Sequence, residues 1–101
     1  SLPPDVENHL LRIGQEALTN AIKYARATQI HVELVCEETQ CVLRIKDNGQ
    51  GFDVDQVSST RGFGLLGMSE RVEQMGGELV IQSQAGQGTE VVVVVSQGSR
   101  V

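Results

Sequence analysis

The chain has 101 residues, enough for one domain with a single core and too few for two. Its net charge of -5 at pH 7, with no run of Lys or Arg, excludes a surface built for direct contact with nucleic acid. No stretch approaches the roughly 18 apolar residues of a membrane span, and no signal peptide is visible, so we expect no membrane contact by this domain. Because the sequence starts at Ser1 rather than Met, we expect residues 1–101 to be one domain of a longer protein.

The first predicted element is an amphipathic helix over residues 5–26. Asp5 follows a pair of prolines and is the expected N-cap. On the polar side, Glu16, Asn20 and Lys23 fall within about 60° of one another. Such a row could act as base, metal ligand and phosphate contact, or it could be an ordinary solvated helix face. The apolar residues recur at steps of three and four, the spacing of a buried face; they are Val6, Leu10, Ile13, Ala17, Ala21 and Tyr24.

Two strands of alternating polarity are predicted at residues 29–37 and 41–47, joined by a short acidic turn. Cys36 and Cys41 could face each other across this hairpin, which would allow a disulfide. Their alternation with the apolar residues of the strands favours instead two small core residues in a reducing compartment.

Asp47 stands at the very end of the second predicted strand. It follows Ile45 on the apolar face, so its carboxylate is expected to point toward the core. A carboxylate there is costly unless hydrogen bonds reach it. Asp47 could cap a turn through neighbouring N–H groups, or it could accept a hydrogen bond from the exocyclic amine of a ligand, which Gly49 and Gly51 would allow to approach. Thr89 begins the last strand on its apolar face and could join the same pocket.

The remaining elements complete the predicted fold. A loop at residues 48–61 leads to a helix at 64–75, and strands follow at 78–84 and 89–96. The order is therefore helix, two strands, helix, two strands. This order predicts an α/β fold of two layers, with a mixed, mostly antiparallel sheet and helices packed on one face.

A second pair of glycines, Gly62 and Gly64, precedes the second helix. It places free backbone N–H groups at a helix N-terminus, where the positive end of the helix dipole favours phosphate. Arg61 adds a positive charge beside them. A glycine pair at this position can also serve chain geometry alone.

Four segments of the sequence, taken together and in this order, resemble a known family. QEALTNAIKYA, DNGQGF, GFGLLGM and GQGTEV resemble the ATP-binding domain of bacterial sensor histidine kinases. This domain has the Bergerat ATP-binding fold, which is shared with type II topoisomerases, mismatch-repair ATPases and one class of heat-shock chaperones. The resemblance covers nearly the whole chain. Only residues 53–61 separate the two glycine segments. A lid this short resembles the lid of one kinase subfamily, whose response regulators carry a LuxR-type DNA-binding domain.

The resemblance implies an activity and a set of site residues. The domain would bind ATP with Mg²⁺ and transfer the γ-phosphoryl group to a histidine of a separate dimerisation and phosphoacceptor domain. It would act in the cytoplasm, as part of a parent protein that is either soluble or membrane-anchored. Glu16 would be the catalytic carboxylate, Asn20 would hold Mg²⁺, and Asp47 would accept a hydrogen bond from the adenine amino group. The other implied ATP contacts are Lys23, Gly49, Gly51, Arg61, Gly62, Gly64, Leu65 and Thr89.

Two positions depart from the family's pattern. Tyr24 stands where relatives often have histidine, and Ser69 stands where many have arginine. Neither belongs to the core nucleotide contacts that the resemblance implies. His9 and His31 lie within the domain's own predicted helix and strand, so neither is expected to be the phosphorylated histidine. Two alternatives remain: a serine kinase of the anti-sigma-factor type, which resembles the same fold, and a module that binds ATP or ADP without transferring phosphate.

Overall fold

The computed structural model describes residues 3–51 and 65–96. The predictions for Arg61, Gly62 and Gly64 therefore lie outside the described residues. The elements are helix α1 (Pro4–Thr19), a π-helical segment η1 (Asn20–Tyr24), strands β1 (Ile30–Cys36) and β2 (Gln40–Asp47), helix α3 (Leu65–Met75), and strands β3 (Glu78–Ser83) and β4 (Thr89–Ser96).

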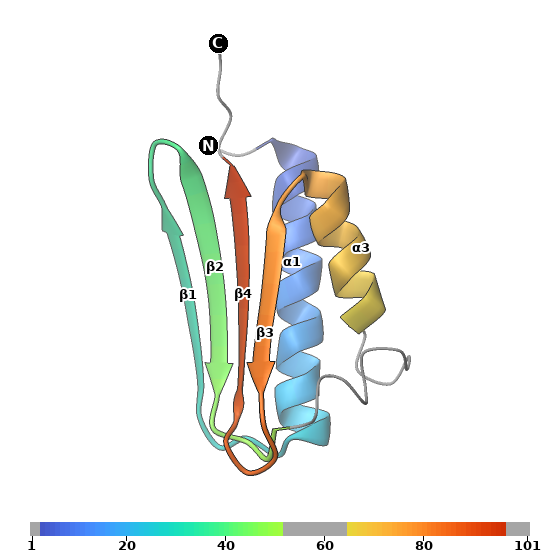
Figure 1. Ribbon diagram of the computed structural model, residues 1–101, viewed down its shortest axis with the longest axis vertical. Coiled ribbons are helices and arrows are strands. Elements are labelled where there is room, and N and C mark those ends of the chain that lie inside the picture. Colours follow the sequence, from blue (N-terminus) through green and yellow to red (C-terminus); the bar gives the residue numbers. More distant parts are fainter. Residues whose placement is uncertain (1–2, 52–64, 97–101) are drawn as a thin grey trace.

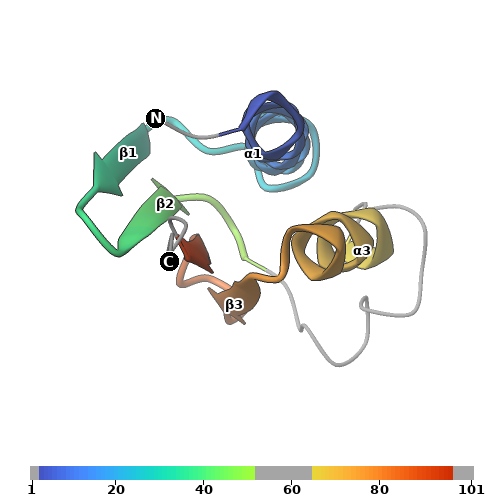
Figure 2. The same cartoon turned by 90° about the horizontal axis from the view of Figure 1, so that it is seen from above.

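The strands form a sheet in the order β1-β2-β4-β3, and each neighbouring pair is antiparallel. Helices α1 and α3 lie against one face of this sheet and leave the other face open (Figures 1 and 2). The predicted α/β fold of two layers, with helices on one face, is confirmed. No helix among the described residues is both long and apolar enough to cross a membrane.

The hydrophobic core fills the space between the helices and the covered face of the sheet. Burial alternates strictly along β2 and β4, because successive side chains of a strand point to opposite faces. Helix α1 adds side chains at helical spacing, as its periodicity predicts. The buried core residues are Leu10, Ile13, Ala17, Leu43, Ile45, Leu65, Met68, Val72, Val91, Val93 and Val95.

The two ends of the first helix differ from the prediction. The helix begins at Pro4, whose fixed φ suits the first turn, so Asp5 lies inside the helix and the N-cap prediction is wrong. Tyr24 was expected on the buried face but is 45% exposed, while Ala25 is buried at 5%. The reason is the π-helical segment, whose i→i+5 pattern adds residues to the turn and rotates Ala25, rather than Tyr24, inward.

The interpretation of both cysteines as reduced core residues is wrong. Cys36 and Cys41 are opposite each other in the β1–β2 pair, with their Cα atoms 4.0 Å apart, and they form a disulfide. Cys41 is buried in the sheet, whereas Cys36 is exposed. The hairpin register brings the two sulfur atoms together, and strand alternation alone could not show this.

Candidate functional site

Asp47 and Thr89 are neighbours across the sheet. The β2–β4 register pairs their Cα atoms, so both side chains point to the covered face of the sheet, as strand parity predicts. Asn20 approaches the same region from the end of the first helix. All three side chains are polar, yet each residue is only 8% exposed. Buried polar groups are rare unless hydrogen bonds or function require them, so this cluster marks a candidate site.

A small cavity of about 10 Å³ lies among these side chains. Its volume corresponds to about one water molecule, so a larger ligand enters only if the walls move apart. Apolar walls with a few convergent polar groups are the usual composition of a site for a flat, mostly apolar ligand. The lining residues are Ala17, Asn20, Ala25, Ile45, Asp47, Leu65, Thr89 and Val91.

The loop after β2 fixes the position of Asp47. The backbone N–H of Gly49 donates to Asp47 Oδ1 at 2.7 Å, so the predicted turn cap is present. Asn48 anchors the loop to the connection between η1 and β1. Its Oδ1 accepts from the backbone N–H groups of Thr28 and Gln29, each at 3.0 Å, and its Nδ2 donates to Thr28 Oγ1 at 2.9 Å. The sequence predicted only a turn at Asn48, because its partners lie about 20 residues away.

The glycines of this loop are required by close contacts within the protein. A side chain at Gly49 would place its Cβ 2.6 Å from the Cβ of Ala25. Gly51 has a φ of +72°, which favours glycine, and a Cβ there would collide with the carbonyl oxygen of Gln84. These contacts hold the loop against the end of the first helix and the β3–β4 turn. The prediction that Gly49 and Gly51 line an adenine base stays a prediction.

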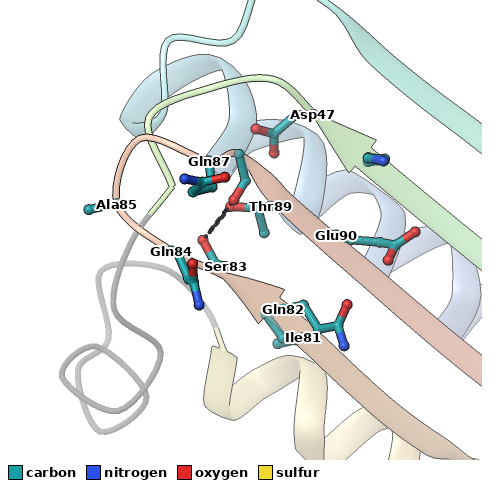
Figure 3. A pocket seen from close by; sticks show the side chains of 11 residues that line it. Asp47, Ile81, Gln82, Ser83, Gln84, Ala85, Gln87, Thr89 and Glu90 are labelled. Atoms are coloured by element: carbon teal, nitrogen blue, oxygen red, sulfur yellow. Dashed lines mark hydrogen bonds between the residues drawn. The ribbon is translucent and has the colours of Figure 1, made fainter.

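A hydroxyl pair extends the polar cluster toward β3. Ser83 Oγ lies 2.7 Å from Thr89 Oγ1 and donates to the carbonyl oxygen of Gly88 at 3.2 Å (Figure 3). Both hydroxyls border an open hollow of about 820 Å³ at the β3–β4 turn, which Asp47 also lines. Ser83 was not among the site residues predicted from the sequence. Strand parity could have found it, because Ser83 ends its strand on the face that carries Leu79 and Ile81.

Glu16 and Lys23 are exposed and do not line the small cavity, although Asn20 does. The predicted row of three polar residues is therefore divided: the middle residue points inward and the outer two face solvent. Leu65, the first residue of α3, is buried and lines the cavity, and its predicted contact with ATP stays a prediction. Neither Tyr24 nor Ser69 contributes to the cavity lining.

No group of three or more His, Cys, Asp or Glu side chains among the described residues could hold a metal ion. The buried amide of Asn20 could supply a single oxygen. One protein oxygen suits an Mg²⁺ ion whose other ligands are phosphate oxygens and water, since Mg²⁺ is usually bound in this way. The donor set therefore fits a metal that arrives with a phosphorylated ligand.

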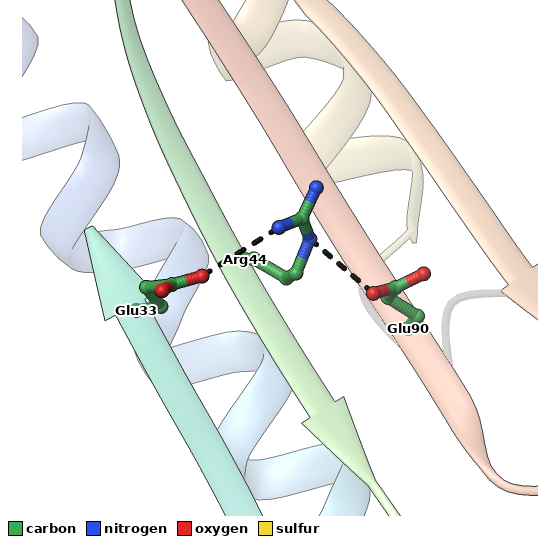
Figure 4. Close-up of polar contacts among 3 residues, drawn as sticks. All are labelled: Glu33, Arg44 and Glu90. Carbon is green, nitrogen blue, oxygen red and sulfur yellow. Dashed lines mark ion pairs between the residues drawn. The ribbon is translucent and has the colours of Figure 1, made fainter. Parts of the chain in front are cut away.

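The open face of the sheet has a different character. Arg44 lies between Glu33 and Glu90, with nitrogen–oxygen distances of 3.5 Å and 3.3 Å (Figure 4). The two carboxylates offset the charge of the guanidinium, so Arg44 is not presented to an anionic ligand. The exposed pairs contribute little to stability.

The chain is similar to one family model and to parts of several bacterial histidine kinases. Residues 5–99 match the family model described as histidine kinase-, DNA gyrase B-, and HSP90-like ATPase. The chain is 43% identical over 94 residues to the signal transduction histidine-protein kinase/phosphatase DegS of Brevibacillus brevis, covering 92% of this chain and 24% of that protein. It is 41% identical over 90 residues to the sensor histidine kinase LiaS of Bacillus subtilis, covering 89% and 25%. The chain thus spans about a quarter of the length of these relatives.

Solved structures show the same fold. The blue-light activated histidine kinase EL346 of Erythrobacter litoralis superposes with a TM-score of 0.79 at 20% identity, covering 95% of this chain and 32% of that chain. The ATP binding domain of PrrB from Mycobacterium tuberculosis gives a TM-score of 0.76 at 24% identity, covering 91% and 69%. On the match over residues 5–99, the chain belongs to the family of histidine kinase-, DNA gyrase B-, and HSP90-like ATPases.

Proposed function

We propose that the domain binds ATP together with Mg²⁺ and transfers the γ-phosphoryl group to a histidine on a separate phosphoacceptor domain. The observation that carries this proposal is the convergence of Asp47, Thr89 and Asn20 on one apolar-walled cavity at the end of β2. The similarity to sensor histidine kinases over about nine-tenths of the chain supports it.

The base-binding part of the proposal rests on hydrogen-bond chemistry. Asp47 offers a buried carboxylate, which accepts hydrogen bonds and does not donate them when ionised. Adenine presents an amino group at position 6, whereas guanine presents a carbonyl oxygen there. The carboxylate therefore favours ATP over GTP. The apolar walls, which include Ile45 and Val91, would contact the faces and edges of the ring. Because the cavity is small, binding requires its walls to move apart.

The phosphate-binding part assigns roles to residues nearer the solvent. Asn20 would contribute one oxygen ligand to Mg²⁺, which supplies charge neutralisation for the phosphates. Lys23 would contact phosphate oxygens, and so would Arg61 and the lid glycines Gly62 and Gly64. Glu16, one helical turn before Asn20, would orient the attacking imidazole and accept its proton. The P–O bond to the β-phosphate breaks, a P–N bond to the histidine forms, and ADP leaves.

The proposal also names partners and a location. The phosphoacceptor domain would belong to the same protein, and a response regulator, in our proposal one with a LuxR-type DNA-binding domain, would take the phosphoryl group from it. The similarity to DegS and LiaS supports this assignment. Because ATP is an intracellular substrate, the domain would act in the cytoplasm.

The test is a transfer assay with γ-labelled ATP. The domain is mixed with the histidine-containing domain of its parent protein, supplied in trans or fused. We expect acid-labile, base-stable label on that domain, and almost no turnover by the ATP-binding domain alone. Acid-stable phosphoserine on a protein partner would support the anti-sigma-factor type of kinase instead. ATP binding without any transfer to the parent's own histidine domain would support the nucleotide-sensing module.

A further inference from the structure

Ser83 occupies a position in the candidate site to which no role has been given. It ends β3 directly opposite Thr89 of β4, on the covered face of the sheet. Its Oγ lies 2.7 Å from Thr89 Oγ1 and 3.2 Å from the carbonyl oxygen of Gly88 (Figure 3). Ser83 borders the open hollow but does not line the small cavity, whereas Thr89 lines both. Ser83 therefore contacts Thr89 without lining the small cavity itself.

The contact of Ser83 with Gly88 favours one direction for the hydrogen bond of this pair. A serine hydroxyl has one hydrogen and two lone pairs. The carbonyl oxygen of Gly88 can only accept, so the hydrogen of Ser83 points to it. In the shorter contact either hydroxyl could donate; with the hydrogen of Ser83 on Gly88, Ser83 accepts from Thr89. In this arrangement the hydrogen of Thr89 is directed toward Ser83, and the lone pairs of Thr89 Oγ1 remain to accept from a ligand or water at the cavity that Thr89 lines.

The consequence is a cavity with two neighbouring acceptors. Thr89 Oγ1 stands beside the carboxylate of Asp47, because the two residues are paired across β2 and β4. Two acceptors favour a ligand edge, or a bridging water, that presents hydrogens. They disfavour an edge that presents a carbonyl oxygen, because the two acceptors of the protein would then face a third acceptor without a hydrogen between them.

We propose that Ser83 is a positioning residue that holds the Thr89 hydroxyl as an acceptor and thereby strengthens the preference for 6-aminopurine over 6-oxopurine nucleotides. This inference rests on the proposed binding of ATP at Asp47. Without the Ser83 hydroxyl, the hydroxyl of Thr89 could rotate and donate into the cavity. A 6-oxopurine would then meet one donor, the hydroxyl of Thr89, and one acceptor, the carboxylate of Asp47, in place of two acceptors.

The experiment compares Mg-ATP with Mg-ITP, which differs from ATP at the purine 6-position and the adjacent N1 hydrogen. Calorimetry gives the ratio of the two dissociation constants for the native domain, Ser83→Ala and Ser83→Thr. We expect the preference for ATP to fall roughly fivefold in Ser83→Ala, the effect of one neutral hydrogen bond. Ser83→Thr keeps the hydroxyl and should keep the ratio.

A purely structural role for Ser83 predicts something different. Loss of a hydrogen bond at the β3–β4 turn would weaken both nucleotides equally and leave the ratio unchanged, which would overturn the proposal. A second comparison uses Thr89→Val alone and Thr89→Val combined with Ser83→Ala. Because Thr89→Val already lacks the hydroxyl that Ser83 is proposed to hold, the two variants should have the same ratio of dissociation constants. A difference between them would also overturn the proposal. Should Ser83→Ala fail to fold, Ser83→Cys replaces the hydroxyl with a group of similar size that is a weaker donor and a weaker acceptor. Its ratio should lie between the native ratio and one about fivefold lower; a native ratio contradicts the proposal.

These results separate the two proposals. Binding of ATP with an unchanged ratio in Ser83→Ala rejects the role of Ser83 and leaves the proposed function standing. Failure of the native domain to bind either nucleotide rejects both.

Discussion

Asp47 is the residue on which the chemistry of the site depends most. A buried carboxylate is costly unless hydrogen bonds compensate for lost water. The structure supplies one such bond, from the backbone N–H of Gly49 at 2.7 Å. A ligand that donates a second hydrogen bond to the same carboxylate would be favoured by its burial, because charge-assisted hydrogen bonds are the stronger ones.

Replacing Asp47 with Asn keeps the shape of the side chain and removes the charged acceptor. A charge-assisted hydrogen bond contributes roughly 1.5–3 kcal/mol, so the affinity for ATP should fall about ten- to a hundredfold. Calorimetry measures the change. The control is Glu33→Gln, which removes a carboxylate from the open face of the sheet and should leave the affinity for ATP unchanged. Unchanged affinity in Asp47→Asn would reject the assignment of the adenine contact. The native domain should also bind GTP poorly.

Glu16 tests the catalytic part of the account. It is exposed and lies one turn before Asn20, so it should act on the transferred phosphoryl group and not on the base. Glu16→Gln should leave nucleotide binding within about a factor of three and lower transfer at least roughly a hundredfold, the effect of a lost general base. Transfer at the native rate, measured with labelled ATP and the acceptor domain, would mean that Glu16 is only a solvated helix residue.

At the scale of elements, the end of the first helix matters most. The π-helical segment begins at Asn20, and π-helical turns often occur at functional sites. It brings Asn20 and Ala25 inward together, so both line the small cavity. The 3.6-residue period of a regular helix predicted Tyr24 on the buried face, and it could not foresee a change of period within the helix.

The β1–β2 hairpin carries the disulfide at the edge of the sheet. Six of the seven residues of β1 are exposed, so packing contributes little to holding this strand. Closing a loop of about six residues constrains the unfolded chain by about 2 kcal/mol in the loop-entropy relation. Reduction of Cys36–Cys41 should therefore lower the free energy of unfolding by about that amount or less, seen as a lower denaturant midpoint.

The control for this prediction is Cys36→Ser, which removes the disulfide at the exposed position and leaves the buried Cys41 in place. Its denaturant midpoint should be the same with and without a reductant. Should the native domain keep its midpoint after mass spectrometry shows full reduction, the disulfide contributes nothing to the stability of the folded domain.

At the scale of the whole molecule, the sequence predicted the two layers and which side chains of β2 and β4 point to the covered face of the sheet. It could do so because burial alternates strictly along both strands and the two faces of the sheet differ in polarity. The same parity predicted Asp47 and Thr89 as neighbours of the core. What it could not predict are contacts between segments far apart in the sequence and the exact register of a hairpin. Asn48 binds Thr28 and Gln29, and the Cys36–Cys41 bond depends on the exact register of a hairpin.

The central claim is that a nucleotide binds where β2, β4 and the end of the first helix meet. It is tested most directly by titrating the ¹⁵N-labelled domain with a non-hydrolysable ATP analogue and Mg²⁺ while recording backbone amide shifts. The account predicts the largest changes at residues 20–25, 47–51 and 88–89, the segments that contain the cavity-lining residues Asn20, Ala25, Asp47 and Thr89. It predicts little change at the Arg44 cluster on the open face. Saturable shifts confined to the open face, or no shifts at millimolar analogue, would contradict it.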